Sequence, residues 1–241
     1  MTEDATPAGA RAGARAGTRA GAIVPQRRGW PDRHPWYRFS RFAVRAFLRS
    51  AADIEVSGME LCPPATGAGL ILACNHLSVM DIPLTGAWCA RTVIYFSKSE
   101  VAEWPLVGGI GRAYGQIYAR RGEADRQAIR VSLSCLAAGN VLGVFPEGHR
   151  SLGRGLLPAQ PGIGLLAARS GVPVWPVAVT GTDRILKDRR PRVSLTAGPA
   201  FDPLAAAAED VGGKPGHQDV ADAIMRRVAR LLPESARGHY R

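Results

Sequence analysis

The segment LILACNHLSVMD, from Leu70 to Asp81, joins an apolar run to a turn that carries a histidine and an aspartate. The four residues LILA are typical of a buried strand. Open α/β sheets bind their ligands beyond the carboxyl ends of their strands. The segment therefore predicts a strand whose end presents His76 and Asp81 to a ligand.

The spacing of the two polar residues limits how they can meet. On a continuous helix, residues five apart point about 140° away from each other, so the two can meet if His76 lies on the turn and Asp81 in the first helical turn. Ser78 and Asp81 also have the spacing of a capping box, with Ser78 as the N-cap and Asp81 near the third helical position. Asp81 can therefore cap a helix, orient a catalytic histidine, or do both.

Composition indicates a globular protein with anionic partners. The 241 residues are 46% hydrophobic, which is enough for one large α/β domain with a sizeable core. The formal charge of +11 favours nucleic acid, acidic lipid surfaces or phosphorylated substrates. The four cysteines form no C-x-x-C pair and no metal-ligand pattern, which indicates buried thiols in a reducing compartment.

The chain has no segment with the pattern of a membrane span. No apolar run reaches the roughly 20 residues that a spanning helix needs, and no apolar signal-peptide core precedes Pro25. We therefore expect a peripheral protein on the cytoplasmic side of the cell membrane.

Three regions differ in composition. Residues 1–34 are near-repeats of Ala, Gly and Arg, which predict a disordered tail. Residues 35–52 predict an amphipathic helix, because arginines recur at helical spacing opposite Trp36, Phe39 and Phe47. Such a helix can lie in a lipid interface or dock on its own domain, and the two roles are compatible.

Residues 53–241 alternate strand and helix patterns, which predict a single α/β domain with a mixed, mostly parallel sheet flanked by helices. Pro173 and Pro176 argue that the sixth strand is an edge or irregular strand. The predicted strands are 53–56, 70–73, 92–96, 116–119, 141–145, 172–179 and 192–197, and the predicted helices are 82–91, 124–138, 162–170 and 219–232.

Three further loops that follow strands carry polar groups, at residues 120–121, 147–150 and 181–184. In a largely parallel sheet, several of these loops converge on His76. A histidine base beside arginines suits a substrate with a nucleophilic hydroxyl and a phosphate, because arginine binds phosphate through a bidentate fork.

Four blocks of sequence carry a family resemblance: NHLSVMD (75–81), GQIYARR (115–121), FPEG (145–148) and VPVWPV (172–177). In this order, and within residues 56–199, they resemble the signature of the glycerolipid acyltransferase family. The resemblance implies transfer of a fatty acyl group from acyl-CoA or acyl carrier protein to the hydroxyl of lysophosphatidic acid, which gives phosphatidic acid. The acyl thioester is then a co-substrate, and neither a cofactor nor a metal is expected.

The resemblance also implies roles for individual residues. His76 would act as the general base, a role that typically contributes about 10²–10⁴-fold to a rate, and Asp81 would hold the other nitrogen of its ring. Arg121, Arg150 and the backbone N–H groups around Gly148 would hold the acceptor phosphate.

Two more residues keep two possible roles each. The resemblance assigns Glu147 to the acceptor site, and the alternative is that its carboxylate stabilises a turn. Asn75 either shapes the turn or donates to a developing oxyanion.

Departures from the family pattern bear on the acceptor. His149 replaces the usual Thr or Ser, Ala159 and Gln160 replace Phe and Lys, and Ala119 and Arg120 replace an apolar–acidic pair. Other lysolipid acceptors, such as lyso-ornithine lipid or a glycosylated phosphoinositide, are therefore the alternative.

Two other functions follow from single features of the chain. Cys74 beside His76 could serve a hydrolase, although a thiol in this position is more often core. The basic charge could serve a non-enzymatic protein that binds an anionic membrane surface or nucleic acid. Nucleic acid is not expected, because no zinc-finger, RRM or helix-turn-helix signature is present.

Overall fold

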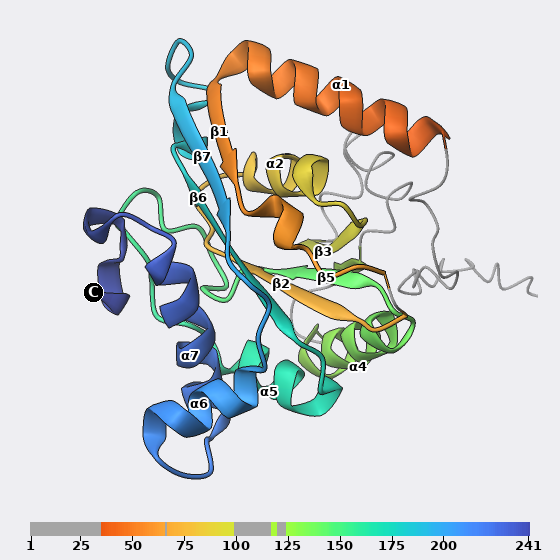
Figure 1. Ribbon diagram of the computed structural model, residues 1–241, viewed down its shortest axis with the longest axis vertical. Helices are drawn as coiled ribbons and strands as arrows, with labels where there is room; N and C mark the ends of the chain where they lie inside the picture. The colour runs from red at the N-terminus through yellow and green to blue at the C-terminus, as the bar shows by residue number, and fades with distance from the viewer. Residues whose placement is uncertain (1–34, 66, 99–116, 120–123) are drawn as a thin grey trace, which may run out of the picture.

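A computed structural model describes residues 35–65, 67–98, 117–119 and 124–241 (Figure 1). The predicted disordered tail, residues 1–34, lies outside the described residues. Arg121, one of the predicted phosphate ligands, also lies outside them.

The described strands form one seven-stranded sheet in the order β1-β7-β6-β2-β5-β3-β4. Every neighbouring pair of these strands is parallel except β6 and β7, which are antiparallel. The prediction of a mixed, mostly parallel α/β sheet is therefore confirmed. The strands are β1 (Asp53–Ser57), β2 (Leu70–Cys74), β3 (Val93–Lys98), β4 (Ile117–Ala119), β5 (Val141–Val144), β6 (Val174–Thr180) and β7 (Arg192–Ala197).

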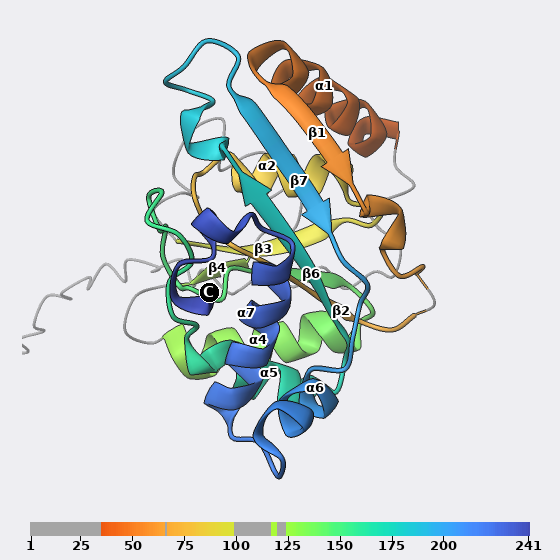
Figure 2. The same ribbon diagram turned by 60° about the vertical axis from the view of Figure 1, so that its left-hand side comes forward.

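Helices cover both faces of the sheet (Figures 1 and 2). On one side lie α1 (Pro35–Ala51) and α2 (Asp81–Trp88). On the other lie α4 (Ala124–Ala137), α5 (Pro161–Ser170), α6 (Pro203–Val211) and α7 (His217–Arg230). This arrangement explains why every residue of β2 is buried, since a central parallel strand is apolar on both faces.

Side chains of β2 alternate between the two cores, as the two-residue period of a strand requires. Leu70, Leu72 and Cys74 pack with the core that includes α1 and α2. Ile71 and Ala73 pack with the core formed by α4, α5, α6 and α7.

The sixth strand differs from the prediction that its prolines favoured. β6 lies between β2 and β7, so it is not an edge strand. The carbonyl of Pro176 accepts a hydrogen bond from the Gly198 N–H at 3.0 Å, and the proline nitrogen cannot donate one in return. Since β7 ends at Ala197, the missing bond falls just beyond the regular β6–β7 ladder. The irregularity is therefore confined to one end of the strand.

A further helix, α6, was not predicted. Its N-terminus is capped by Asp202, whose carboxylate accepts hydrogen bonds from the N–H groups of Leu204 and Ala205 at 2.9 and 3.2 Å. An aspartate before Pro203 is a regular helix start, but the following run of alanines lacks the periodic pattern on which the prediction depended.

Helix α1 docks on the domain through a face that combines buried Tyr37 and Leu48 with Arg41 and Arg45. Arg45 donates to the Ala87 carbonyl at 2.8 Å, and Arg41 donates to the carbonyls of Ala87 and Cys89. These carbonyls end α2, where a cation also interacts favourably with the helix dipole. The exposed large hydrophobic side chains of α1 are Phe39, Phe42 and Phe47, whereas Tyr37 is buried. Of the two predicted roles of this helix, docking on its own domain is confirmed.

The order of the strands brings three loops together. β2 has β5 and β6 as its two neighbours, and all three strands are parallel. The loops that begin at His76, Glu147 and Thr182 therefore leave the same edge of the sheet side by side.

Candidate active site

His76 and Asp81 form a hydrogen-bonded pair at the carboxyl edge of β2. The ring nitrogen Nδ1 of His76 lies 2.8 Å from Oδ2 of Asp81. Asp81 is fully buried, whereas the His76 side chain is 18% exposed. With Nδ1–H donated to the carboxylate, the other ring nitrogen, Nε2, keeps its lone pair for a substrate.

The His76 ring has a second support. It stacks on Phe145, with 4.0 Å between the ring centroids and 14° between the planes. Phe145 lies just after β5 and in turn stacks on Tyr95 of β3. The imidazole is therefore held at one edge by Asp81 and on one face by Phe145, which fixes its direction.

Asp81 is the most heavily bonded side chain of the site. Its Oδ2 also accepts hydrogen bonds from the N–H groups of Leu77 and Ser78 at 2.7 and 2.8 Å. Its Oδ1 accepts a hydrogen bond from the hydroxyl of Thr182, which is itself buried. Four donors thus fix the carboxylate that orients His76.

The turn before α2 differs from the prediction in where the helix starts. Met80 rather than Ser78 is the N-cap, and Asp81 is the first residue of α2 rather than the third, so both predicted positions were wrong. The bond from the Ser78 N–H to Asp81 is one half of a capping box. In place of the other half, the Ser78 hydroxyl accepts from the Met80 N–H at 3.3 Å. Asp81 both caps the turn and orients the histidine.

Thr182 was missed as a site residue. Its loop was singled out in the sequence as one of three polar loops, but no pattern assigned a role to the threonine. The residue before it, Gly181, has a left-handed backbone (φ 73°) and turns the chain directly after β6. This turn brings the Thr182 hydroxyl to Asp81.

Glu147 is buried and holds backbone rather than facing the solvent. Its Oε1 accepts from the His76 N–H at 2.8 Å and its Oε2 accepts from the Leu157 N–H at 3.0 Å. Burial raises the pKa of this carboxyl, and the two N–H donors and nearby histidines offset part of that rise. These contacts favour the alternative role, in which Glu147 stabilises the turn that carries His76.

Asn75 has a similar role. Its side-chain oxygen accepts from the Val179 N–H at 2.8 Å, and its side-chain nitrogen donates to the Val179 carbonyl at 3.0 Å. These bonds join the end of β2 to β6, so Asn75 shapes the turn. The sulfur of the neighbouring Cys74 is fully buried, and this burial raises the pKa of its thiol well above the usual value. A protonated, buried thiol is a poor nucleophile.

The predicted acceptor loop has an exposed outer side. Gly148 has a left-handed backbone (φ 74°), and a Cβ there would lie 3.2 Å from Cγ of Gln160. His149 and Arg150 follow it and are exposed. The loop is fixed to the catalytic turn, because the Ser151 N–H donates to the His76 carbonyl at 2.8 Å. Arg150 is therefore carried by a loop bonded to His76.

Comparison with known proteins identifies similar chains. The model of the acyltransferase family matches residues 53–180. Over 129 residues, the chain is 37% identical to a lyso-ornithine lipid O-acyltransferase of Pseudomonas aeruginosa, covering 53% of this chain and 47% of that one. Over 141 residues, it is 32% identical to a 1-acyl-sn-glycerol-3-phosphate acyltransferase of Neisseria gonorrhoeae, covering 57% and 54%. The chain thus spans about half the length of these curated relatives.

A solved structure is also similar. The crystal structure of the 1-acyl-sn-glycerophosphate acyltransferase of Thermotoga maritima superposes with a TM-score of 0.63 at 28% identity. The match covers 81% of this chain and 80% of that chain.

Proposed function

This chain belongs to the acyltransferase family, and from that premise we propose that it transfers an acyl group from an acyl thioester to the hydroxyl of a lysolipid. The first candidate acceptor is lysophosphatidic acid, with phosphatidic acid as the product. The observation that carries the proposal is the His76–Asp81 pair, in which a buried, fully bonded carboxylate orients a partly exposed imidazole.

The chemistry needs a base because an alcohol is a poor nucleophile at neutral pH. Nε2 of His76 removes the hydroxyl proton as the oxygen attacks the thioester carbonyl carbon. The new C–O bond forms, the C–S bond breaks, and the imidazolium returns the proton to the thiolate. Asp81 stabilises the imidazolium between these steps. The nucleophile comes from the substrate, so the chain needs no nucleophile of its own, and the buried Cys74 thiol is not required.

A second acceptor is supported by specific observations. The P. aeruginosa relative carries the name lyso-ornithine lipid O-acyltransferase, as does one of Rhizobium meliloti that is 26% identical over 187 residues. The exposed His149 also departs from the family pattern in the loop proposed to meet the acceptor. Lyso-ornithine lipid carries no phosphate, whereas lysophosphatidic acid does. The side chains of this loop would therefore have to bind a different head group in each case.

Contact with a membrane surface would deliver both acceptors, and exposed apolar side chains support it. Phe42 and Phe47 of α1 are 69% and 56% exposed. Val79, in the turn between His76 and Asp81, and Leu152, in the loop after Glu147, are also exposed. Among the described helices, none is long and apolar enough to cross a membrane. We propose that these side chains enter the lipid interface beside the site.

The test is a transfer assay with the purified chain. Each lysolipid acceptor is presented in mixed vesicles with either acyl-CoA or acyl carrier protein as the donor, and products are identified by mass. We expect one acceptor to gain a single acyl chain at least about tenfold faster than the others. If no lysolipid is acylated with either donor, the proposed function is wrong.

A further inference from the structure

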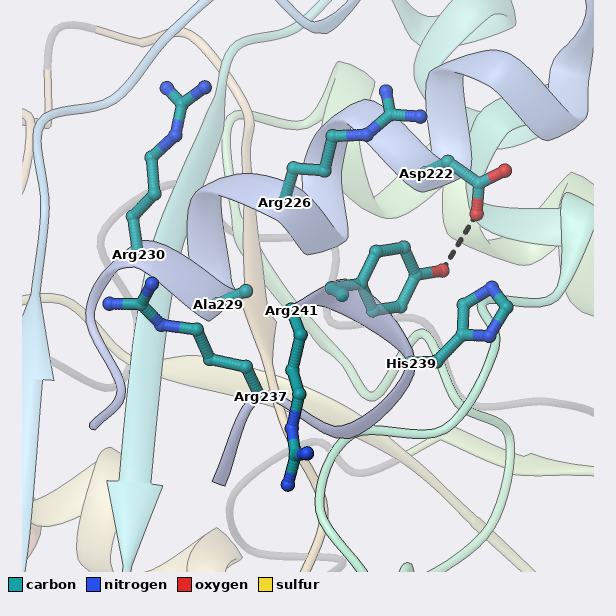
Figure 3. Close-up of a pocket in the computed structure, with 8 residues that line it drawn as sticks. Asp222, Arg226, Ala229, Arg230, Arg237, His239 and Arg241 are labelled. Atoms are coloured by element: carbon teal, nitrogen blue, oxygen red, sulfur yellow. Dashed lines mark hydrogen bonds between the residues drawn. The ribbon is translucent and has the colours of Figure 1, made fainter. Parts of the chain in front are cut away.

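A cavity lies between α7 and the C-terminal segment, far along the chain from the His76–Asp81 pair. Its volume is about 370 Å³. Figure 3 shows Arg230 and Arg237 on one side of it and Asp222 and His239 on the other. The residues that line the cavity are Asp222, Arg226, Ala229, Arg230, Arg237, His239, Tyr240 and Arg241.

The cavity carries an excess of positive charge. Of its four arginines, Arg226 forms an ion pair with Asp210 at 2.6 Å. The single acidic side chain in the lining, Asp222, accepts a hydrogen bond from the Tyr240 hydroxyl at 2.7 Å. Within the described part of the chain, Arg230 and Arg237 form no ion pair. At least two guanidinium groups of the cavity are therefore not neutralised by the protein.

The wall of the cavity is a built part of the fold. The Leu156 N–H donates to the Ala236 carbonyl at 3.1 Å, and the His239 N–H donates to the Leu156 carbonyl at 2.9 Å. Gly238 allows this approach, because a Cβ there would lie 2.4 Å from the Leu156 carbonyl oxygen. The Ala159 N–H also donates to the Tyr240 hydroxyl at 2.8 Å. The C-terminal segment is thus fastened to the loop that follows the FPEG block.

The positive charge that the arginines give the cavity does not depend on pH in the physiological range. Arginine remains protonated at any physiological pH. Burial, with a contribution from the bond to Asp222, raises the pKa of the Tyr240 hydroxyl. The Tyr240 hydroxyl therefore stays protonated and continues to donate its hydrogen bond to the Asp222 carboxylate.

We propose that this cavity binds the phosphate groups of a small phosphorylated molecule. A guanidinium presents two parallel N–H donors that match the oxygens of a phosphate. Arg230 and Arg237 bring this chemistry from two different segments, α7 and the C-terminal segment. Nε of Arg237 donates to the Leu232 carbonyl at 3.1 Å, so its Nη groups are the ones that would face a phosphate. The His239 and Tyr240 rings add flat surfaces beside the charges, as a nucleotide would need. The phosphate can come from the nucleotide end of coenzyme A, from a phospholipid head group or from a free phosphate.

The site does not depend on acyl transfer, because none of the residues that line it belongs to the His76–Asp81 network. Its test therefore measures ligand binding and not acyl transfer. If the cavity binds no phosphate, the proposed function still stands or falls on the transfer assay alone. The probes are coenzyme A and inorganic pyrophosphate, measured by titration calorimetry, and phosphatidic acid in phosphatidylcholine vesicles, measured by co-sedimentation.

The variants are matched in charge. Arg230→Gln/Arg237→Gln removes two positive charges from the cavity. Lys187→Gln/Arg189→Gln removes two from the exposed loop between β6 and β7 and serves as the control. The single variant Arg230→Gln is tested as well. Because Arg230 forms no ion pair with the described residues, its replacement should leave the fold intact even if the double variant does not fold. Thermal unfolding of each variant checks the fold.

For at least one probe, we expect the cavity variant to weaken binding at least about tenfold, since each lost charged hydrogen bond weakens binding about that much or more. The control variant should change the same affinity less than about twofold. The probe that loses most affinity identifies the source of the phosphate. The proposal is overturned if no probe binds the wild type, if the cavity variant binds as well as the wild type, or if both double variants lose affinity equally.

Discussion

Replacing Thr182 by valine tests whether the buried network around Asp81 serves catalysis. Valine keeps the shape of threonine but removes the hydroxyl that donates to Oδ1 of Asp81, in a site where Asp81 is fully buried. Loss of a hydrogen bond to a charged group costs about 1.5–3 kcal/mol. For a chain of this size, that corresponds to a fall in Tm of about 3–12 °C.

The catalytic effect follows from the geometry that remains. Oδ2 of Asp81 keeps its bonds from His76, Leu77 and Ser78, so the carboxylate stays in place but can tilt. Because small misplacements of a catalytic group cost up to about 10²-fold, we expect kcat to fall about 10- to 100-fold. KM should change little, since Thr182 is buried behind Asp81.

Steady-state acyl-transfer kinetics on Thr182→Val and Thr182→Ser separate positioning from stability. Serine restores the hydroxyl and should recover most of kcat, while valine should not. If Thr182→Val unfolds at a lower temperature but turns over like the wild type, the hydroxyl only stabilises the fold and the reasoning fails.

Three more predictions concern other parts of the molecule. Phe42→Ser/Phe47→Ser should weaken binding to anionic vesicles at least about tenfold in co-sedimentation, because the variant lacks the two rings that we propose enter the lipid. Its Tm should be nearly unchanged, since both side chains are exposed in the folded chain. Glu147→Gln should change the pH dependence of stability. Burial raises the folded pKa of Glu147, so the native state holds an extra proton between about pH 4.3, the pKa of an unfolded glutamate, and that raised pKa. Across this window, the unfolding free energy of the wild type relative to the variant should fall as pH rises. Denaturant titrations at several pH values that give a constant difference would contradict this. Cys74→Ala should lose about 1 kcal/mol of stability but turn over substrate like the wild type. Loss of turnover in a folded variant would instead favour the alternative in which Cys74 is the nucleophile of a hydrolase.

The elements that the sequence predicted best are those with local signals. The strand–turn–helix from Leu70 to Asp81 was predicted because its apolar run and polar turn are contiguous. The His76–Asp81 contact joins residues only five apart, so a turn followed by a helix was enough to anticipate it. A local contact needs no knowledge of the rest of the fold.

Contacts that cross the sheet were beyond the reach of the sequence. The bond from Thr182 to Asp81 joins residues 101 apart, and the bonds from Asn75 to Val179 join residues 104 apart. Both depend on β6 pairing with β2, which no local pattern specifies. For the same reason the sequence left open whether Asn75 and Glu147 contact substrate or backbone.

Helix α1 illustrates a different limit. Its two faces were predicted, but not which one meets the domain. Arginines usually face water, yet Arg41 and Arg45 bind the carbonyls that end α2. This choice depends on the position of α2, and it leaves Phe39, Phe42 and Phe47 exposed.

The most direct test of the central claim is the kcat of His76→Ala for acylation of the acceptor that the wild type prefers. Loss of the base should lower kcat at least about 100-fold, while Tm and the circular dichroism spectrum show a folded chain. The matched control, His217→Ala, removes an exposed histidine at the start of α7 and should turn over like the wild type. If folded His76→Ala transfers acyl groups as fast as the wild type, His76 is not the base and the account of the site is wrong.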